Sequence, residues 1–316
     1  MTRYEIEPIN LDKIRTYELA SRPSKVTATQ FSKAINPEDR LKDFLEKLPD
    51  ILAVKQLREI AKQIKRAKSL NKPIIWGIGG HVIKTGLSPI LIDLIEKGFV
   101  SAIASNGSVI VHDTEIALVG FTSEDVDSAI GKGDFGAAKE TGEIINLAAK
   151  YGLENQIGLG EAIGKILSET SPKNADISLI CQAYQNRIPF TVHLTIGADI
   201  GHFHASADGA ALGATSHTDF RLFCSLVKQM NAGGVYLNVG SAVVLPEVFL
   251  KAVTVVRNLG FLLEDFTTAN FDFIQHYRPN TNVVKRPTAN GAGRGFSLTG
   301  HHEIMIPLLA AHLVIE

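Results

Sequence analysis

The stretch Pro73-Ile74-Ile75-Trp76-Gly77-Ile78-Gly79-Gly80-His81 runs from an apolar segment straight into a glycine-rich turn. Residues 73–78 form a short continuous apolar run, which is typical of a strand buried on both faces. Residues 41–70 before it carry Ala, Leu, Glu and Lys at helical spacing, and residues 87–97 after it are also predicted to be helical. A buried strand between two helices is the repeating unit of a parallel sheet.

The same alternation continues along the chain. Strand-like runs follow at 100–104, 190–194, 235–239 and 261–267. Helical spacing occurs at 136–150, 160–168, 178–186, 218–230 and 247–259. Strands separated by helices of this length predict an α/β fold with a doubly wound, Rossmann-like parallel sheet. We expect residues 1–70 to form an N-terminal extension with helices packed on the main domain, and residues 71–316 to form one α/β domain.

Composition limits the kind of function. The 32 basic and 33 acidic residues nearly cancel, which excludes a basic nucleic-acid surface and favours a small-molecule site. Only two cysteines occur, Cys181 and Cys224, so the spacing gives neither a disulfide framework nor a cysteine metal site. The first residues are polar, and no window reaches the apolar length of a membrane span. A reducing, cytoplasmic location is therefore expected.

Glycine and small polar residues follow each predicted strand. In a parallel sheet the ligand lies outside the carboxyl ends of the strands, where glycine lets the backbone approach it closely. The loops concerned are Gly77-Ile78-Gly79-Gly80-His81, Ser105-Asn106-Gly107-Ser108, Thr195-Ile196-Gly197-Ala198-Asp199, Asn238-Val239-Gly240-Ser241 and Thr267-Thr268-Ala269. Five such loops at one edge suit a dinucleotide. The usual Gly-x-Gly-x-x-Gly spacing is missing, however, and no acidic residue ends the second strand to hold a ribose.

A lysine near the C-terminal end is a candidate nucleophile. The run Thr267-Thr268-Ala269-Asn270-Phe271-Asp272 is followed by Arg278-Pro279 and then by Lys285 among apolar residues. A lysine whose pKa is lowered by burial can form imines with carbonyl compounds. The competing interpretation is a solvated surface lysine, which is the usual environment of this residue type.

A histidine-rich tract offers a second kind of chemistry. His202 and His204 share one face if the segment is extended, and His217 and Asp219 follow in the chain. Nitrogen and oxygen ligands of this kind are accepted by zinc or iron. Histidines at a sheet edge also act as general acids and bases near neutral pH. The tract is therefore either a metal site, a proton-transfer site or ordinary packing.

Taken together, the loops resemble those of the deoxyhypusine synthases. The segment from Gly79 to Leu87, with Thr85, and the Ser105-Asn106-Gly107-Ser108 loop are similar to that family's first two NAD-contacting loops. The segments Thr195–Gly201 and Val239–Val244 are similar to two further glycine loops, and Thr268-Ala269, Asp272, Arg278-Pro279 and Lys285 match the family's order of residues near its catalytic lysine. Val283-Val284 stand where the family has Trp-Gly.

The resemblance implies an NAD-binding homotetramer that oxidises a polyamine and passes an aminoalkyl group through a lysine imine to a protein acceptor. It implies Lys285 as the covalent carrier and Asp272 as the residue that orients the amine, and we assign proton transfer to His202 or His204. The expected NAD-binding residues are Gly79, Gly80, Thr85, Ser105, Asn106, Gly107, Asp199, Gly240, Ser241, Thr268 and Ala269. Two alternatives stay open: a metal-dependent hydrolase or lyase using His202, His204, His217 and Asp219, and a non-catalytic NAD-binding protein.

Overall fold

The computed structural model describes residues 3–315, which divide after Ile51 into two compact units. The first unit contains the short helices η1 (Leu19–Ser21), η2 (Ala28–Gln30) and α1 (Leu41–Lys47). The single helix expected over 41–70 is interrupted after α1 and resumes as α2 (Leu52–Ser69). The interruption has a local cause, because Leu48 precedes Pro49 and adopts the extended conformation that a following proline imposes.

The second unit is built on one sheet of six parallel strands in the order β3-β2-β1-β4-β5-β6. This order is that of a doubly wound, Rossmann-like fold, so the predicted fold class is confirmed. Its strand order reverses between β1 and β4, and a ligand crevice is expected there. The strands are β1 (Ile74–Ile78), β2 (Ala102–Asn106), β3 (Phe190–His193), β4 (Val235–Val239), β5 (Phe266–Asp272) and β6 (Gly293–Thr299).

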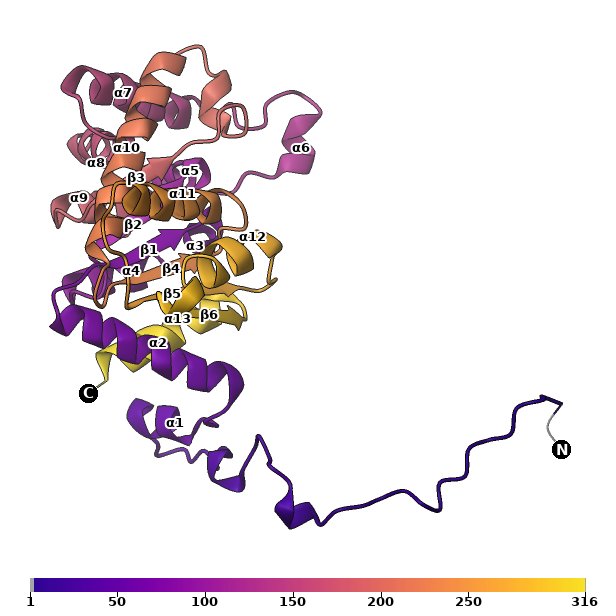
Figure 1. Cartoon of the computed structure of the whole chain (residues 1–316). Coiled ribbons are helices and arrows are strands. Elements are labelled where there is room, and N and C mark those ends of the chain that lie inside the picture. The colour runs from indigo at the N-terminus through magenta and orange to yellow at the C-terminus, as the bar shows by residue number, and fades with distance from the viewer. Residues whose placement is uncertain (1–2, 316) are drawn as a thin grey trace. The chain divides into compact units, whose positions relative to one another are not determined.

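Helices cover both faces of this sheet (Figure 1). The helices of the unit after α2 are α3 (Gly80–Lys84), α4 (Ser88–Glu96), α5 (Gly107–Val119), α6 (Val126–Ile130), α7 (Lys139–Asn155), α8 (Leu159–Glu169), α9 (Leu179–Gln185), η3 (Ile200–Phe203), α10 (Gly209–Gln229), α11 (Val244–Asn258), α12 (Tyr277–Pro279), η4 (Asn280–Lys285), η5 (Ala289–Gly291) and α13 (His302–Val314). The contacts of α2 with β1, β4, β5, β6 and α13 group it with the sheet. The predicted domain boundary at 70/71 stays a prediction.

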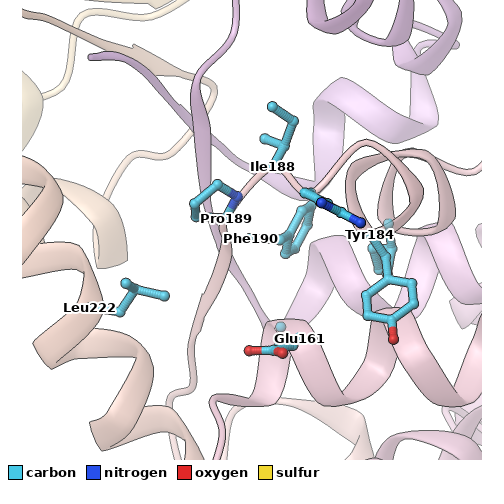
Figure 2. Close-up of a pocket in the computed structure, with 9 residues that line it drawn as sticks. Glu161, Tyr184, Ile188, Pro189, Phe190 and Leu222 are labelled. Atoms are coloured by element: carbon cyan, nitrogen blue, oxygen red, sulfur yellow. The ribbon is translucent and has the colours of Figure 1, made fainter. Parts of the chain in front are cut away.

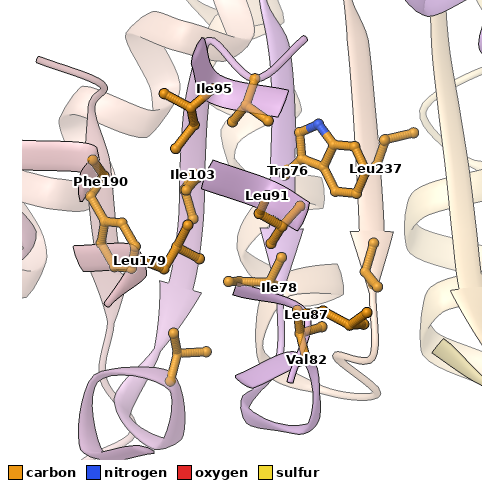
Figure 3. Close-up of a cluster of buried hydrophobic side chains, with 14 of the residues drawn as sticks. Trp76, Ile78, Val82, Leu87, Leu91, Ile95, Ile103, Leu179, Phe190 and Leu237 are labelled. Carbon is orange, nitrogen blue, oxygen red and sulfur yellow. The ribbon is translucent and has the colours of Figure 1, made fainter. Parts of the chain in front are cut away.

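The two faces have separate apolar cores because side chains alternate along each strand. Trp76 and Leu237 face α2, α4 and α13, whereas Ile75 and Tyr236 face α10 and α11. Figure 3 shows Trp76 within the first of these cores. Its indole Nε1 donates to the carbonyl oxygen of Phe99 at 3.1 Å, so the buried polar atom of this ring is satisfied. The expectation that Trp76 is a core residue is confirmed.

Several boundaries differ from the prediction. The strand expected at 261–267 is β5, which starts at Phe266 and continues to Asp272, and the helix expected at 218–230 is α10, which starts at Gly209. Residues 288–295, for which no strand was predicted, contain η5 and the start of β6. The glycines of β6 hid the strand, although packing requires them. A Cβ on Gly295 would lie 2.2 Å from the carbonyl oxygen of Val284.

Within residues 3–315, no helix combines the length and the apolar character that a membrane span requires.

Candidate functional site at the carboxyl edge of the sheet

The backbones after β1 and β4 touch at the reversal point of the sheet. Gly79 donates its N–H to the carbonyl oxygen of Val239 at 2.9 Å. A Cβ on Gly79 would lie 2.2 Å from the carbonyl oxygen of Gly240, a distance that no side chain tolerates. Gly240 itself has φ +67°, a left-handed conformation that favours glycine. The two glycines therefore let the main chains of the β1 and β4 loops contact each other directly, at the place where this fold binds its ligand.

An acidic side chain lies over the end of β2. Asn106 caps α5, since its Oδ1 accepts from Val109 N–H at 3.3 Å. The carboxyl group of Asp199, from the loop after β3, lies against Gly107, the residue that follows Asn106. A Cβ on Gly107 would be 2.1 Å from Asp199 Cγ. Asp199 Oδ2 accepts from Thr195 N–H at 2.9 Å, and burial raises the pKa of this carboxyl despite that bond and the nearby His202 ring. The acid missing from the end of the second strand is thus supplied by another loop.

A cavity of about 230 Å³ opens beside Asp199 and the first turns of α5. Its lining includes Lys84, His112, Glu115, Phe135, Asp199 and Ile200. The cavity therefore joins charged groups to an apolar wall, next to the glycine turn after β1.

His112 in this cavity is part of a hydrogen-bonded series. Its Nδ1 is 2.7 Å from Thr122 Oγ1, and that hydroxyl donates to Glu115 Oε2. Thr141 Oγ1 donates to the other oxygen of Glu115 at 3.3 Å. Burial lowers the pKa of His112 to about 4, and the charge of Lys84 acts in the same direction. The ring is therefore neutral at pH 7, and its 3.9 Å approach to Glu115 is not an ion pair.

A histidine cluster lies at the ends of β5 and β6. His302 is fully buried, and its Nε2 donates to the carbonyl oxygen of Phe271 at 3.1 Å and lies 3.9 Å from Asp272 Oδ1. Its Nδ1 is buried and has no partner among the described residues. Burial lowers the pKa of His302, although Phe271 and Asp272 oppose this. The partly exposed ring of His81, from the turn after β1, packs against the His302 ring with 5.4 Å between their centroids. It brings a second imidazole to the edge.

A buried amide network fixes the loop that follows Asp272. Asn238 Nδ2 donates to Asn270 Oδ1 at 2.7 Å, and Asn270 Nδ2 donates to Gln275 Oε1 at 2.9 Å. Gln275 Nε2 in turn donates to the carbonyl oxygen of Leu298 in β6 at 2.8 Å. Buried polar groups need such partners, and a hydrogen-bonded network rigidifies the segment it holds, although Asn238 Oδ1 is buried without a partner among the described residues. The network therefore ties the ends of β4, β5 and β6 together.

Most of the predicted cofactor residues meet at this edge. They are Gly79, Gly80, Asn106, Gly107, Asp199, Gly240 and Ser241, joined by Asp272 at the end of β5. Ser241 Oγ accepts from Leu245 N–H at 3.2 Å and so helps to start α11.

The other four predicted cofactor residues lie within strands or at the end of α3. Thr268 and Ala269 were expected in a loop after the strand, but they are fully buried in the middle of β5. Ser105 is buried and donates to the carbonyl oxygen of Thr191 at 2.9 Å. Thr85 ends α3 and donates back to His81 O at 2.9 Å. For Thr268 and Ala269 the physical reason is register, because β5 continues for three residues beyond Ala269.

The structure does not bring Lys285 to the edge. Lys285 is an exposed residue at the end of η4. The neighbouring Val284 carbonyl lies beside Gly295, whose register partner is Thr268, four residues before the end of β5. Four residues correspond to about 13 Å along a strand. The sequence-based expectation of an apolar environment fails because the apolar neighbours, such as Val283, point into the core and leave the lysine in solvent.

The residues of the alternative metal site are dispersed. His202 Nδ1 accepts from Gly197 N–H at 3.2 Å, and His204 Nε2 pairs with the carbonyl oxygen of Gly136 at 3.0 Å. His217 lies within α10, where its ring packs near Phe220. Asp219 caps α8 by accepting from Gly160 N–H at 2.9 Å. Among residues 3–315, no three His, Cys, Asp or Glu side chains are arranged to hold a metal ion, so a single chain does not bring the predicted ligands together.

A second cavity, of about 260 Å³, opens at the amino end of β3. Figure 2 shows Glu161, Tyr184 and Leu222 around it. Because Phe190, the first residue of β3, lines this cavity, it lies at the opposite end of the strands from the glycine loops.

Comparison with known proteins supports the same architecture. A family model described as "Arginine dihydrolase ArgZ-like, C-terminal, Rossmann fold" matches residues 58–174. No curated protein matches the chain.

Solved structures extend the likeness over most of the chain. A conserved candidate LOR/SDH protein from Methanococcus maripaludis S2 is 17% identical with a TM-score of 0.50, covering 84% of this chain and 70% of that one. AgrE, solved in a ternary complex with ornithine and NAD+, is 15% identical with a TM-score of 0.54, covering 82% of this chain and 32% of its own. This chain therefore spans about a third of AgrE.

The deoxyhypusine synthase resemblance is also found at the level of structure. A candidate deoxyhypusine synthase from Entamoeba histolytica is 11% identical with a TM-score of 0.50, and 89% of this chain covers 95% of that one. At such identities these likenesses establish the fold.

Sequence reasoning assigned no individual role to His81, His302 or His112. His302 begins α13 just after β6, and it would have stood out at a strand end had β6 been recognised. His112 had no comparable signal, because its partner Thr122 lies beyond the end of α5 and is joined to it only by folding.

Proposed function

We propose that this protein is an NAD-dependent enzyme that oxidises a small amine, with the dinucleotide lying along the carboxyl edge of the sheet. The observation that carries the proposal is the Asp199 carboxyl over the end of β2, beside the Gly79–Gly240 contact. An acid at this position accepts hydrogen bonds from a ribose diol, and glycine backbones let a pyrophosphate approach. Asp199 Oδ1 has no hydrogen-bond partner among residues 3–315, so an acceptor is free.

The residues present fit the cofactor. Gly79 and Gly240 let the main chains of the β1 and β4 loops pack together with no side chain between them, and the cavity beside Asp199 has room for a base. Bound NAD supplies a hydride acceptor. At the opposite end of the edge, the buried Asp272 carboxyl favours a cationic amine, since charges interact strongly in a water-poor site. His81 is the partly exposed imidazole that takes the proton from the amine nitrogen, with His302 packed behind it.

Two observations support an amine as the substrate class. One is the grouping of Asp272 with the imidazoles of His302 and His81 at the end of β5, which suits a group that must lose a proton before it is oxidised. The other is the neighbour AgrE, which was solved with ornithine and NAD+. The direct test is absorbance at 340 nm with NAD and a panel of amines that includes ornithine and spermidine. NADH formation that depends on the amine supports the proposal, whereas NAD binding without turnover supports the non-catalytic alternative.

Preference for NAD over NADP gives a specific prediction. The Asp199 carboxylate repels a 2′-phosphate, so we expect NAD to bind at least about 100-fold more tightly than NADP. In Asp199→Ser the ratio should fall below about tenfold. Asp208→Ala, which removes an acid that caps α10, should leave the ratio unchanged. Calorimetric titration with both dinucleotides measures this, and equal affinities in the unmodified protein would contradict the assignment of Asp199.

The transfer step through Lys285 is tested separately. Because Lys285 is exposed and distant from the edge within one chain, we expect oxidation without a lysine adduct. The protein is incubated with NAD and spermidine, reduced with borohydride and weighed by mass spectrometry beside Lys285→Ala. An adduct of aminobutyl size that disappears in the variant would instead establish aminoalkyl transfer through this lysine.

A further inference from the structure

The series Glu115–Thr122–His112 fixes the proton position on the His112 ring. A carboxylate only accepts hydrogen bonds, so the Thr122 hydroxyl must donate its single proton to the hydrogen bond with Glu115. The contact between Thr122 Oγ1 and His112 Nδ1 then requires the ring to donate from Nδ1. In a neutral imidazole the other nitrogen must be an acceptor. His112 Nε2 therefore carries a lone pair.

Three features keep that lone pair available. His112 is neutral at pH 7, because it is largely buried and lies near the Lys84 cation. Nε2 has no hydrogen-bond partner in the described part of the chain and is not among its fully buried atoms. The ring carbon Cδ2, which is bonded to Nε2, would lie 3.1 Å from a Cβ on Gly80. His112 lines the cavity, and its Nε2 is thus an acceptor next to the turn after β1.

The cavity lies at the adenosine end of the proposed dinucleotide site. It adjoins Asp199, the proposed ribose ligand, and its wall includes Phe135 and Ile200, which are apolar surfaces for a flat base. On the base edge that distinguishes purines, adenine presents an amino donor at position 6, whereas hypoxanthine and guanine present an oxygen acceptor there.

We propose that His112 is a specificity residue that accepts a hydrogen bond from the 6-amino group of adenine and thereby rejects 6-oxo purine dinucleotides. Glu115 and Thr122 are the positioning residues, because they hold the ring in the form that accepts. The inference rests on the proposed NAD site and deepens it. An acceptor such as His112 Nε2 discriminates well between the two kinds of purine, because the oxygen of a 6-oxo purine would place its lone pair against that of the ring nitrogen.

Calorimetric titration of the whole protein with NAD and with nicotinamide hypoxanthine dinucleotide tests this. The two differ only at position 6 of the purine, and we expect NAD to bind about 10- to 100-fold more tightly. Thr122→Val, which keeps the side-chain shape but removes the hydroxyl, should reduce that ratio to about threefold or less. Thr122→Ser should restore it. His112→Phe should bring the ratio close to one, with folding of each variant checked by thermal unfolding.

Each outcome separates the two proposals. Equal affinity for both dinucleotides in the unmodified protein, or a ratio unchanged in Thr122→Val and His112→Phe, overturns the role of His112 and leaves the NAD site standing. If neither dinucleotide binds, the proposed function itself is wrong.

Discussion

Gly79→Ala is expected to weaken NAD binding by at least about 100-fold, equivalent to about 2.7 kcal/mol. The added Cβ would lie 2.2 Å from the carbonyl oxygen of Gly240 and 3.3 Å from Ser241 N. Both neighbours are main-chain atoms, so the clash can be relieved only by separating the β1 and β4 loops. That movement displaces the surface on which the proposed pyrophosphate lies.

The same clash should also cost stability, by about 1–3 kcal/mol for an overpacked site. Gly213→Ala is the matched control, because a Cβ on Gly213 meets nothing within 4 Å and the residue lies within α10. It should bind NAD normally and unfold at the same temperature or slightly higher. Calorimetry gives the affinities and circular dichroism the unfolding temperatures. Normal NAD affinity in Gly79→Ala would show that the cofactor lies elsewhere.

Asp219→Ala should lower the free energy of unfolding by about 2–4 kcal/mol, because buried N–H groups lose their acceptor. Asp219 Oδ2 accepts from Gly160 N–H and from Val192 N–H, both at 2.9 Å, and so joins the start of α8 to β3. The comparison is Asp208→Ala, which removes a partly exposed helix cap and should cost only about 1 kcal/mol. Equal losses in the two variants would contradict a special role for the buried acid.

Asp219 also predicts how stability depends on pH. Burial raises its pKa from 3.8 to about 7, despite the backbone N–H groups that oppose this. The folded state therefore holds a proton that the unfolded state has lost, and stability should fall as pH rises from about 4 to about 7. The fall has an upper limit of about 4 kcal/mol, since one pKa unit corresponds to about 1.4 kcal/mol.

The matched variant for this effect is Asp219→Asn, which keeps an oxygen acceptor but cannot ionise. The unfolding free energy of both proteins is measured in denaturant from pH 4 to 8. The variant should not show the fall in stability with rising pH that Asp219 causes in the unmodified protein. An identical slope in both proteins would assign the pH dependence to other groups.

The sequence predicted the parallel α/β sheet correctly because strands β1 to β4 are short apolar runs, which local pattern reveals. It was less accurate for β5 and β6. β5 carries four polar residues at its buried positions, and β6 carries two glycines, so neither has the apolar pattern of a buried strand. These errors moved Thr268 and Ala269 to the wrong place and hid the position of His302.

The sequence by itself determined that glycine turns would follow the central strands, since Gly79 and Gly240 come directly after apolar runs. Only the tertiary structure decided which side chains meet there. Asp199 reaches the end of β2 from the loop after β3, and Thr122 returns to His112 from beyond α5. It also separated Lys285 from Asp272, which the resemblance to the deoxyhypusine synthases implied as partners. Local patterns record backbone conformation and burial, whereas contacts between distant segments depend on strand register and loop path, which no local pattern contains.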